Sequence, residues 1–166
     1  MTPAQQTALE GVAVRALTAQ EVEDIDPLLD PDNRNDVAIA AILSVGRTRL
    51  QSRMIGERGI MAALGTVEGE ACLAAFEAFA ASTLPDEHPL KRHHAGIKRM
   101  LSWLKTDAGL DIGTPQAGEL LGIMAQLGIL DGAWVATIMA LAQVADPIAV
   151  ADVSRVLNAA EGRMQL

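Results

Sequence analysis

Two short segments of this chain share one pattern, and that pattern restricts the fold to helices joined by tight turns. The segments are Met61–Gly69 (MAALGTVEG) and Met124–Gly132 (MAQLGILDG). Each contains an apolar helix end, a glycine, two further residues, an acid and a second glycine. Glycine readily adopts the left-handed conformation that ends a helix. The acid is favourable at the positive N-terminus of the next helix. Both segments therefore predict a helical hairpin.

The choice of apolar residues also favours helices. Half of the 166 residues are apolar, yet the chain has only two Phe, two Trp and no Tyr. The core must therefore be built from Ala, Leu, Ile, Val and Met, and small side chains let helices approach closely. Aromatic and β-branched residues, which sheets prefer, are too few and too scattered for a sandwich or barrel. We expect an all-α fold, a compact bundle of about seven to nine short helices built from αα-hairpins.

Capping signals and apolar periodicity place these helices along the chain. Thr18 and Glu21 form a capping box, in which hydroxyl and carboxylate satisfy first-turn amides. That helix ends near Asp26, because the residue before a proline avoids the α region. Residues 46–59 hold arginines and two close glycines, so a frayed helix, an extended arm and a short hairpin all stay open, and a partly irregular connection is favoured. Helices are expected at about 3–14, 19–26, 35–45, 58–64, 67–82, 89–106, 115–127, 132–144 and 149–160.

Acidic residues concentrate near the N-terminus and suggest how the chain is divided. Only Arg34 relieves a block of acids that consists of Glu21, Glu23, Asp24, Asp26, Asp30, Asp32 and Asp36. We therefore expect an acidic N-terminal helical segment over residues 1–34 and a helical core domain over residues 35–166, together forming one globular unit.

The overall charge argues against nucleic acid as a partner. The formal net charge is −8 at pH 7, and such a field repels phosphate groups. The single cysteine, Cys72, excludes an intramolecular disulfide and fits a reducing compartment. It lies in an apolar helical run, where we expect a buried, inert thiol. No charged region followed by a continuous apolar stretch opens the chain, so no signal peptide is expected.

One stretch, Leu120 to Ala145, carries only the charge of Asp131 and is long enough to span a bilayer. However, Gly128 and the pair Asp131-Gly132 lie at its centre and indicate a turn. We therefore expect two short helices there, each too short to cross a bilayer, and no membrane partner.

Residue types that support catalysis or metal binding do not form a recognisable pattern. The serines lack the flanking glycines of a nucleophile elbow, and no glycine-rich phosphate loop is present. His93 and His94 are adjacent, so they point in different directions on a helix, and no HExxH or CxxC spacing occurs. His94 falls on the apolar row of its helix, which predicts a half-buried or interface histidine. We expect no catalytic residue, no cofactor and no metal.

Basic side chains are the best candidates for contact with a partner. Lys91, Lys98 and Lys105 recur every seven residues and form a ridge beside the apolar row of the helix expected at 89–106. A solvated face, docking onto an acidic protein and docking onto nucleic acid are the three interpretations of this ridge. The scarcity of aromatic residues for base stacking disfavours the third. The partner-binding residues expected on these grounds are Arg47, Arg49, Arg53, Arg58, Lys91, Lys98 and Lys105.

The arginines of residues 47–58 and the acidic block lie close together in sequence and have opposite charge. They could pair within one chain. Alternatively, the acidic segment of one copy meets the basic segment of the next, which would support a ring or a chain of copies. The sequence leaves both arrangements open.

Several short elements between about residues 35 and 158 form a pattern, and the most specific of them is LSVGRT, Leu43 to Thr48. The other elements are Asn35–Ala40, Ile55-Gly56, Ile60–Leu73, Gly109–Gly113, Asp146-Pro147 and Ala151–Ser154. With these elements most of the chain resembles a family of small proteins encoded in tailed bacteriophages and prophages. The long basic helix from Pro89 to Lys105 is more charged than the family pattern, and residues 1–34 lie outside the match.

The resemblance implies a phage protein from the virion-assembly gene region, and it brings no catalytic residues with it. We therefore expect a non-enzymatic structural component of a tailed-phage virion, in the tail or neck, that acts through protein–protein contacts. Its partners would be other virion proteins and possibly itself, and it would reside in the host cytoplasm before assembly. The alternatives are a non-virion accessory protein that binds a host factor and, less favoured, a membrane-active lysis factor.

Overall fold

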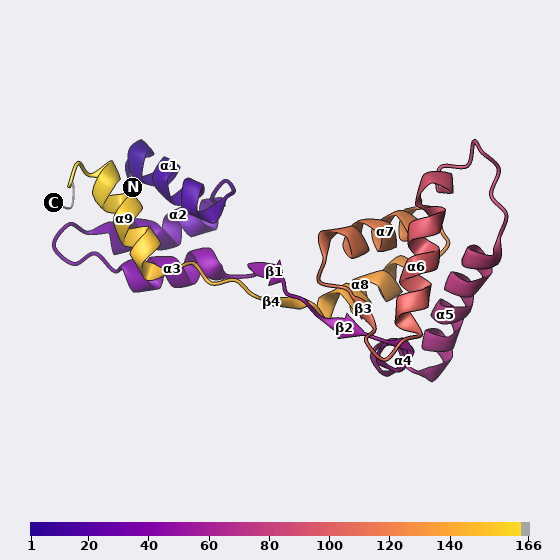
Figure 1. Ribbon diagram of the computed structural model, residues 1–166. Helices are drawn as coiled ribbons and strands as arrows, with labels where there is room; N and C mark the ends of the chain where they lie inside the picture. The colour runs from indigo at the N-terminus through magenta and orange to yellow at the C-terminus, as the bar shows by residue number, and fades with distance from the viewer. Residues whose placement is uncertain (164–166) are drawn as a thin grey trace. The chain divides into compact units, whose positions relative to one another are not determined.

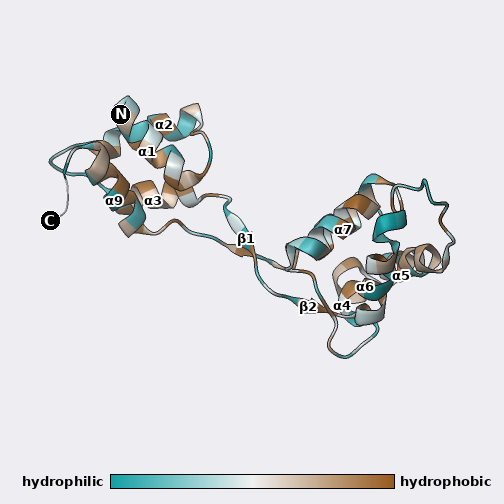
Figure 2. Cartoon of the chain, turned by 45° about the horizontal axis from the view of Figure 1, so that its top comes forward, coloured by the Kyte–Doolittle hydropathy of each residue, from teal (hydrophilic) through white to brown (hydrophobic). Residues whose placement is uncertain are grey.

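The computed structural model describes residues 1–163, and helices dominate that range (Figure 1). Nine α-helices lie within the described residues, whereas the strands there form only two small two-stranded sheets, β1 with β4 and β2 with β3. The predicted all-α fold class is therefore confirmed. Several helices carry both apolar and polar residues, as expected of amphipathic elements (Figure 2).

Contacts divide the chain into two units. Unit 1 comprises Met1–Arg49 and the described residues from Ala145 onward, and unit 2 comprises Leu50–Val144. The elements of unit 1 are α1 (Pro3–Ala13), α2 (Ala19–Ile25), the 3₁₀ turn η1 (Asp26–Leu29), α3 (Asp36–Ser44) and α9 (Val150–Ala160). The elements of unit 2 are β2 (Met54–Ile55), α4 (Glu57–Leu64), α5 (Thr66–Ala81), the 3₁₀ turn η2 (Lys91–His93), α6 (His94–Leu104), β3 (Leu110–Asp111), α7 (Pro115–Gln126) and α8 (Gly132–Ala140). The unit boundaries fall within β1 (Thr48–Leu50) and β4 (Gln143–Ala145).

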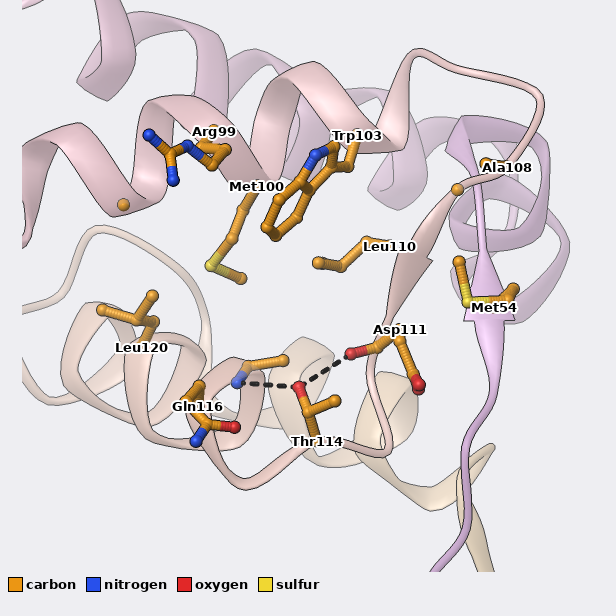
Figure 3. Close-up of a pocket in the computed structure, with 13 residues that line it drawn as sticks. Met54, Arg99, Met100, Trp103, Ala108, Leu110, Asp111, Thr114, Gln116 and Leu120 are labelled. Carbon is orange, nitrogen blue, oxygen red and sulfur yellow. Dashed lines mark hydrogen bonds between the residues drawn. The ribbon is translucent and has the colours of Figure 1, made fainter.

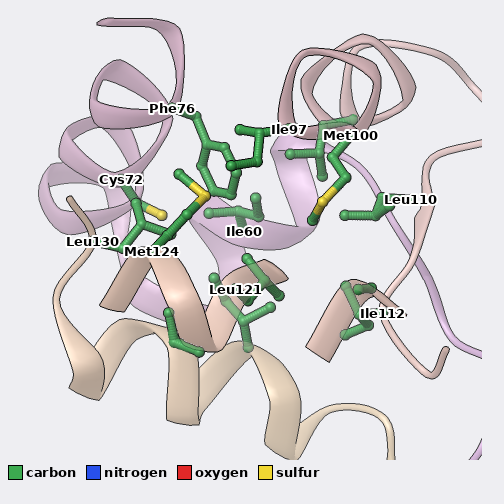
Figure 4. Packing of buried hydrophobic residues seen from close by; sticks show 14 of the residues in the cluster. Ile60, Cys72, Phe76, Ile97, Met100, Leu110, Ile112, Leu121, Met124 and Leu130 are labelled. Carbon is green, nitrogen blue, oxygen red and sulfur yellow. The ribbon is translucent and has the colours of Figure 1, made fainter. Parts of the chain in front are cut away.

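These units do not follow the expected division at residue 34/35. The acidic N-terminal segment is not separate, because α1 and α3 both pack against α9. Leu9 and Leu157, which come from opposite ends of the chain, are fully buried in one apolar cluster. The larger core belongs to unit 2 and surrounds the fully enclosed Phe76 and Met124 (Figure 4).

Both predicted helical hairpins are present, as α4–α5 and α7–α8. Gly65 and Gly128 have φ values of +85° and +69°, the left-handed region that glycine adopts without steric cost. The side chain of Asp131 accepts a hydrogen bond from the Ala133 amide at 2.7 Å and so caps α8. At Gly69 a Cβ atom would lie only 2.7 Å from Met61 Cα. That glycine therefore permits the close approach of α5 to α4.

Between Thr48 and Ile55 the chain forms the strands β1 and β2, and α4 begins at Glu57, so of the open alternatives the extended arm describes the segment best. It is not a hairpin, because β1 pairs with β4 and β2 pairs antiparallel with β3. Two helix ends differ from expectation. The helix expected at 89–106 begins only at His94, after the turn η2, and the helix expected at 132–144 stops at Ala140. In the second case β4 takes over, because the backbone from Gln143 pairs with β1 instead of continuing the helix.

The stretch that resembled a membrane span is divided as expected, with α7 and α8 on either side of a turn. Among the described residues, no helix combines the length and the apolar character that crossing a bilayer requires.

Candidate functional site

A cleft of about 630 Å³ lies in unit 2 (Figure 3). This volume lies in the range typical of ligand pockets. Helix α6 and the first turns of α7 supply most of the lining, and strands β2 and β3 with the loops next to β3 supply the rest. The side chains that give the cleft its apolar character are Met54, Met100, Trp103, Leu110, Ala117 and Leu120.

Helical spacing explains why α6 lines this cleft. Gly96, Arg99, Met100 and Trp103 all line it, and positions i, i+3, i+4 and i+7 share one face of a helix. Gly96 makes room at one end, because a Cβ atom there would already contact Leu120 Cδ1 at 3.6 Å. A larger side chain at residue 96 would therefore fill the space that the cleft now leaves open.

Two large apolar side chains at the cleft are exposed to solvent. Trp103 is 46% exposed and Met54 is 52% exposed, whereas Met100, which lies deeper, is 2% exposed. Figure 3 shows the Trp103 ring and the Met100 thioether on the side of α6 that faces the cleft. Tryptophan and methionine are enriched at the centres of protein interfaces. Their exposure here therefore favours a surface that another molecule covers.

The positive charge at the cleft comes from Arg99. Within residues 1–163 no carboxylate lies within ion-pair distance of its guanidinium group, and the group makes no hydrogen bond there. The first turn of α7 adds to this positive character, because helix N-termini carry a partial positive charge. In that turn the Thr114 side chain accepts the Ala117 amide at 3.3 Å.

The acid of the cleft lining, Asp111, is already engaged elsewhere. Its carboxylate accepts hydrogen bonds from the Ser52 hydroxyl at 2.7 Å and from the Arg53 amide at 2.9 Å. The Ser52 hydroxyl and then the Arg53 and Gly113 amides lower the pKa of Asp111. Figure 3 shows this carboxylate turned toward the β2 side. Asp111 therefore ties β3 to the segment before β2, and its charge is directed away from Arg99.

Two other residues with reactive side chains, Cys72 and His94, pack inside unit 2. Cys72 is fully buried, as predicted, and burial raises its thiol pKa to about 11, so the nucleophilic thiolate is suppressed at neutral pH. His94 is half-buried, also as predicted, and its Nε2 lies 3.1 Å from the Phe79 carbonyl oxygen. Its ring meets the Phe79 ring edge-on with centroids 5.3 Å apart. No group of three His, Cys, Asp or Glu side chains in residues 1–163 is arranged to hold a metal ion.

The four arginines predicted to bind a partner are divided between the two units. Arg47 belongs to unit 1 and is largely occupied, because it contacts the Asp146 carboxylate at 2.9 Å and the Ala13 carbonyl oxygen at 2.8 Å. Its hydrogen bond to Ala13 thereby caps the C-terminus of α1. Arg49, also in unit 1, is more exposed and lies 3.8 Å from Asp146. Arg53 and Arg58 are exposed residues of unit 2.

The predicted lysine ridge is partly neutralised by its surroundings. Lys91 donates to the Leu84 carbonyl oxygen at 2.8 Å and lies 3.2 Å from Asp86. Lys105 is paired with Glu77 of α5, which raises the pKa of Lys105. Lys98 and Lys105 line a shallow groove with Glu77. These two lysines therefore lie on the α5 side of α6, whereas Arg99 lies at the cleft.

Pairing between the acidic block and the arginines of residues 47–58 is not seen in the part of the chain that the structure describes. Instead, Glu21 pairs with Arg15. Asp36 pairs with Arg34, whose Nε lies 2.8 Å from its carboxylate. The second arrangement, in which opposite charges meet between copies, stays a prediction.

Sequence reasoning did not find the cleft. The available signal was Trp103, one of only two tryptophans, which lies off the apolar row of its helix together with Gly96 and Arg99.

Comparisons with protein-family models, with curated proteins and with solved structures give no match for this chain.

Proposed function

We propose that this chain is a non-enzymatic structural component of a tailed-phage virion, and that it holds its place by binding a partner protein in the cleft of unit 2. The observation that carries the binding role is the half-exposed Trp103 at an apolar cleft of about 630 Å³. The resemblance of residues 35–158 to a phage family is the reason for placing the protein in a virion. Contact through an apolar anchor with a charged rim is the usual architecture of a protein interface.

The face of unit 2 around the cleft has a lower free energy against a partner protein than against water. Burying the exposed part of a tryptophan is favourable, because apolar surface removed from water contributes roughly 25 cal/mol per Å². Hot-spot residues at interfaces are enriched in tryptophan and arginine. Trp103 and Arg99 are one helical turn apart on the same face of α6. Together they can anchor and orient one partner.

The test is incorporation into particles produced by the phage or prophage that encodes the chain. Quantitative mass spectrometry of purified virions should find the wild-type protein at a fixed copy number. Gly96→Leu fills the cleft and should lower that copy number at least tenfold. Gly96→Ala is the matched control, because its Cβ makes only ordinary van der Waals contact with Leu120. It should be incorporated like wild type.

Two other results would change the proposal. Absence of the wild-type protein from particles, with the cleft still needed for infection, would identify a non-virion accessory protein. Normal incorporation of Gly96→Leu would show that the cleft is not the attachment site. Circular dichroism of both variants checks that each one is folded.

A further inference from the structure

We infer that the cleft selects an acidic partner, namely an apolar peptide segment of another protein that places a carboxylate beside Arg99. This inference rests on the proposed binding role of the cleft and adds the chemical class of what it binds.

The apolar part of the cleft sets the size of the occupant. Met54, Trp103 and Leu110 lie on one side, and Leu120 lies across from them on α7 (Figure 3). A volume of about 630 Å³ accommodates a few bulky side chains but not a whole helix. The occupant is therefore a short apolar segment that enters the cleft from a larger partner.

The unpaired charge of the cleft is positive. Arg99 has no carboxylate partner among residues 1–163, and the Asp111 carboxylate is held by Ser52 and Arg53 on the β2 side. The backbone amide of Gln116, in the first turn of α7, finds no acceptor in the described part of the chain. A carboxylate is a well-matched ligand for an unpaired guanidinium beside apolar surface, because the two groups form two parallel hydrogen bonds.

Comparison with the cations on and next to α6 supports this selection. Lys91 and Lys105, which flank α6, have acidic partners in their own unit, Asp86 and Glu77. Lys98 and Arg99 lie within α6 and have none among the described residues, but only Arg99 lines the cleft. A basic segment in the cleft would place a like charge beside Arg99, which is unfavourable.

The experiment uses two synthetic heptapeptides with identical leucine and phenylalanine positions, one carrying glutamates and the other lysines at the remaining positions. Binding to the 166-residue chain is followed by Trp103 fluorescence, in a Trp134→Phe background that removes the other tryptophan of this sequence. The acidic peptide should bind about tenfold more tightly than the basic one, the size of one charge-assisted hydrogen bond. The preference should shrink as salt is raised.

Variants separate charge selection from apolar binding. Arg99→Glu should reverse the preference, while Arg99→Lys should keep its sign with a smaller ratio. Lys98→Glu, next in the chain but on the α5 side, is the matched control and should leave the preference unchanged. Gly96→Leu should abolish binding of both peptides.

Three outcomes would overturn the inference. Equal binding of the two peptides, unaffected by Arg99→Glu, would show an apolar site without charge selection and leave the proposed function standing. Preference for the basic peptide would contradict the assigned sign. A dimer in sedimentation that disappears in Gly96→Leu would show that a second copy, not an acidic partner, fills the cleft.

Discussion

Different kinds of interaction stabilise the interior of each of the two units. Unit 1 assembles helices from both ends of the chain and has the smaller apolar cluster. It adds a polar network around Arg34, which contacts Glu161 at 2.9 Å and Asn158 at 2.7 Å as well as Asp36. Unit 2 is continuous in sequence, and its larger apolar core is combined with glycines that let backbone segments touch.

The difference shows how each unit obtains a defined arrangement. Helix α9 has no short connection to α3, so directional ion pairs and hydrogen bonds select its position. Gln5 of α1 also donates to Glu161 at 3.0 Å, which brings a third helix into the network. In unit 2 short turns restrict the hairpins α4–α5 and α7–α8, and close backbone packing at glycines completes the arrangement. This leaves the face of α6 at the cleft free of internal partners.

The largest predicted effect is that of Gly113→Ala in unit 2. A Cβ atom at this position would lie 2.0 Å from the Gln51 carbonyl oxygen and 2.8 Å from the Ser52 amide nitrogen. Both are backbone atoms, so the segment before β2 must move and the hydrogen bonds from Ser52 and Arg53 to Asp111 are lost. We expect a loss of about 3 kcal/mol or more in the free energy of unfolding, measured by urea denaturation.

Hydrogen exchange would locate this loss. Amides of unit 2 should lose protection in Gly113→Ala, while amides of α1 and α9 should keep theirs. Equal loss throughout the chain would show that the two units unfold as one, and the contrast between them would not extend to stability.

The corresponding substitution in unit 1 is Arg34→Met. It leaves Asp36 and Glu161 without their cation, although their side chains are only 16% and 17% exposed. We expect a loss of about 2–4 kcal/mol, because an unpaired charge in a partly buried site is costly. The triple variant Arg34→Met, Asp36→Asn, Glu161→Gln should recover part of it.

The control for Arg34 is Arg155→Ala in α9, whose ion pair with Asp152 is well exposed. Such a pair contributes about 0.5 kcal/mol or less. Equal effects of Arg34→Met and Arg155→Ala in thermal unfolding would show that the network is ordinary surface charge and does not position α9.

Much of the helical architecture was predictable because its signals are local. The glycine and acid pattern of Met61–Gly69 and Met124–Gly132 specified both hairpins, since helix capping involves residues only a few positions apart. The half-buried state of His94 followed from its place on an apolar helix row.

The units and the cleft could not be predicted because they depend on contacts between distant residues. Nothing near Arg34 in sequence indicates that Glu161 is its partner. The sequence around Lys105 gives no sign of an acidic partner, because Glu77 comes close to it only through the packing of α5. The cleft requires Gly96, Trp103 and β3 to meet, and periodicity alone does not distinguish an empty helix face from a covered one.

A smaller effect should appear as pH dependence at Asp111. Hydrogen bonds from Ser52, Arg53 and Gly113 lower its pKa from the ordinary value of 3.8. A lowered pKa stabilises the folded state fully above the unfolded pKa, and this contribution is lost as the pH falls from about 4 through the folded pKa. The urea midpoint of wild type should therefore decrease below pH 4 more steeply than that of Asp111→Asn.

Asp107→Asn is the control for Asp111, because Asp107 is exposed and its carboxylate makes no hydrogen bond within residues 1–163. Its pH profile should match wild type. If Asp111→Asn gave the wild-type slope as well, the link between β3 and the segment before β2 would not depend on the carboxylate charge.

The smallest effect, and one of opposite sign, is expected for Gly122→Ala in α7. No atom lies within 4 Å of a Cβ placed there. Alanine restricts the unfolded chain and favours the helix, so the free energy of unfolding should rise by about 0.5–1 kcal/mol. Gly113→Ala and Gly122→Ala are the same chemical change in one unit, so opposite shifts in the urea midpoint would show that backbone contact, not glycine content, decides stability in unit 2. A destabilised Gly122→Ala would mean that α7 needs its flexibility at that turn.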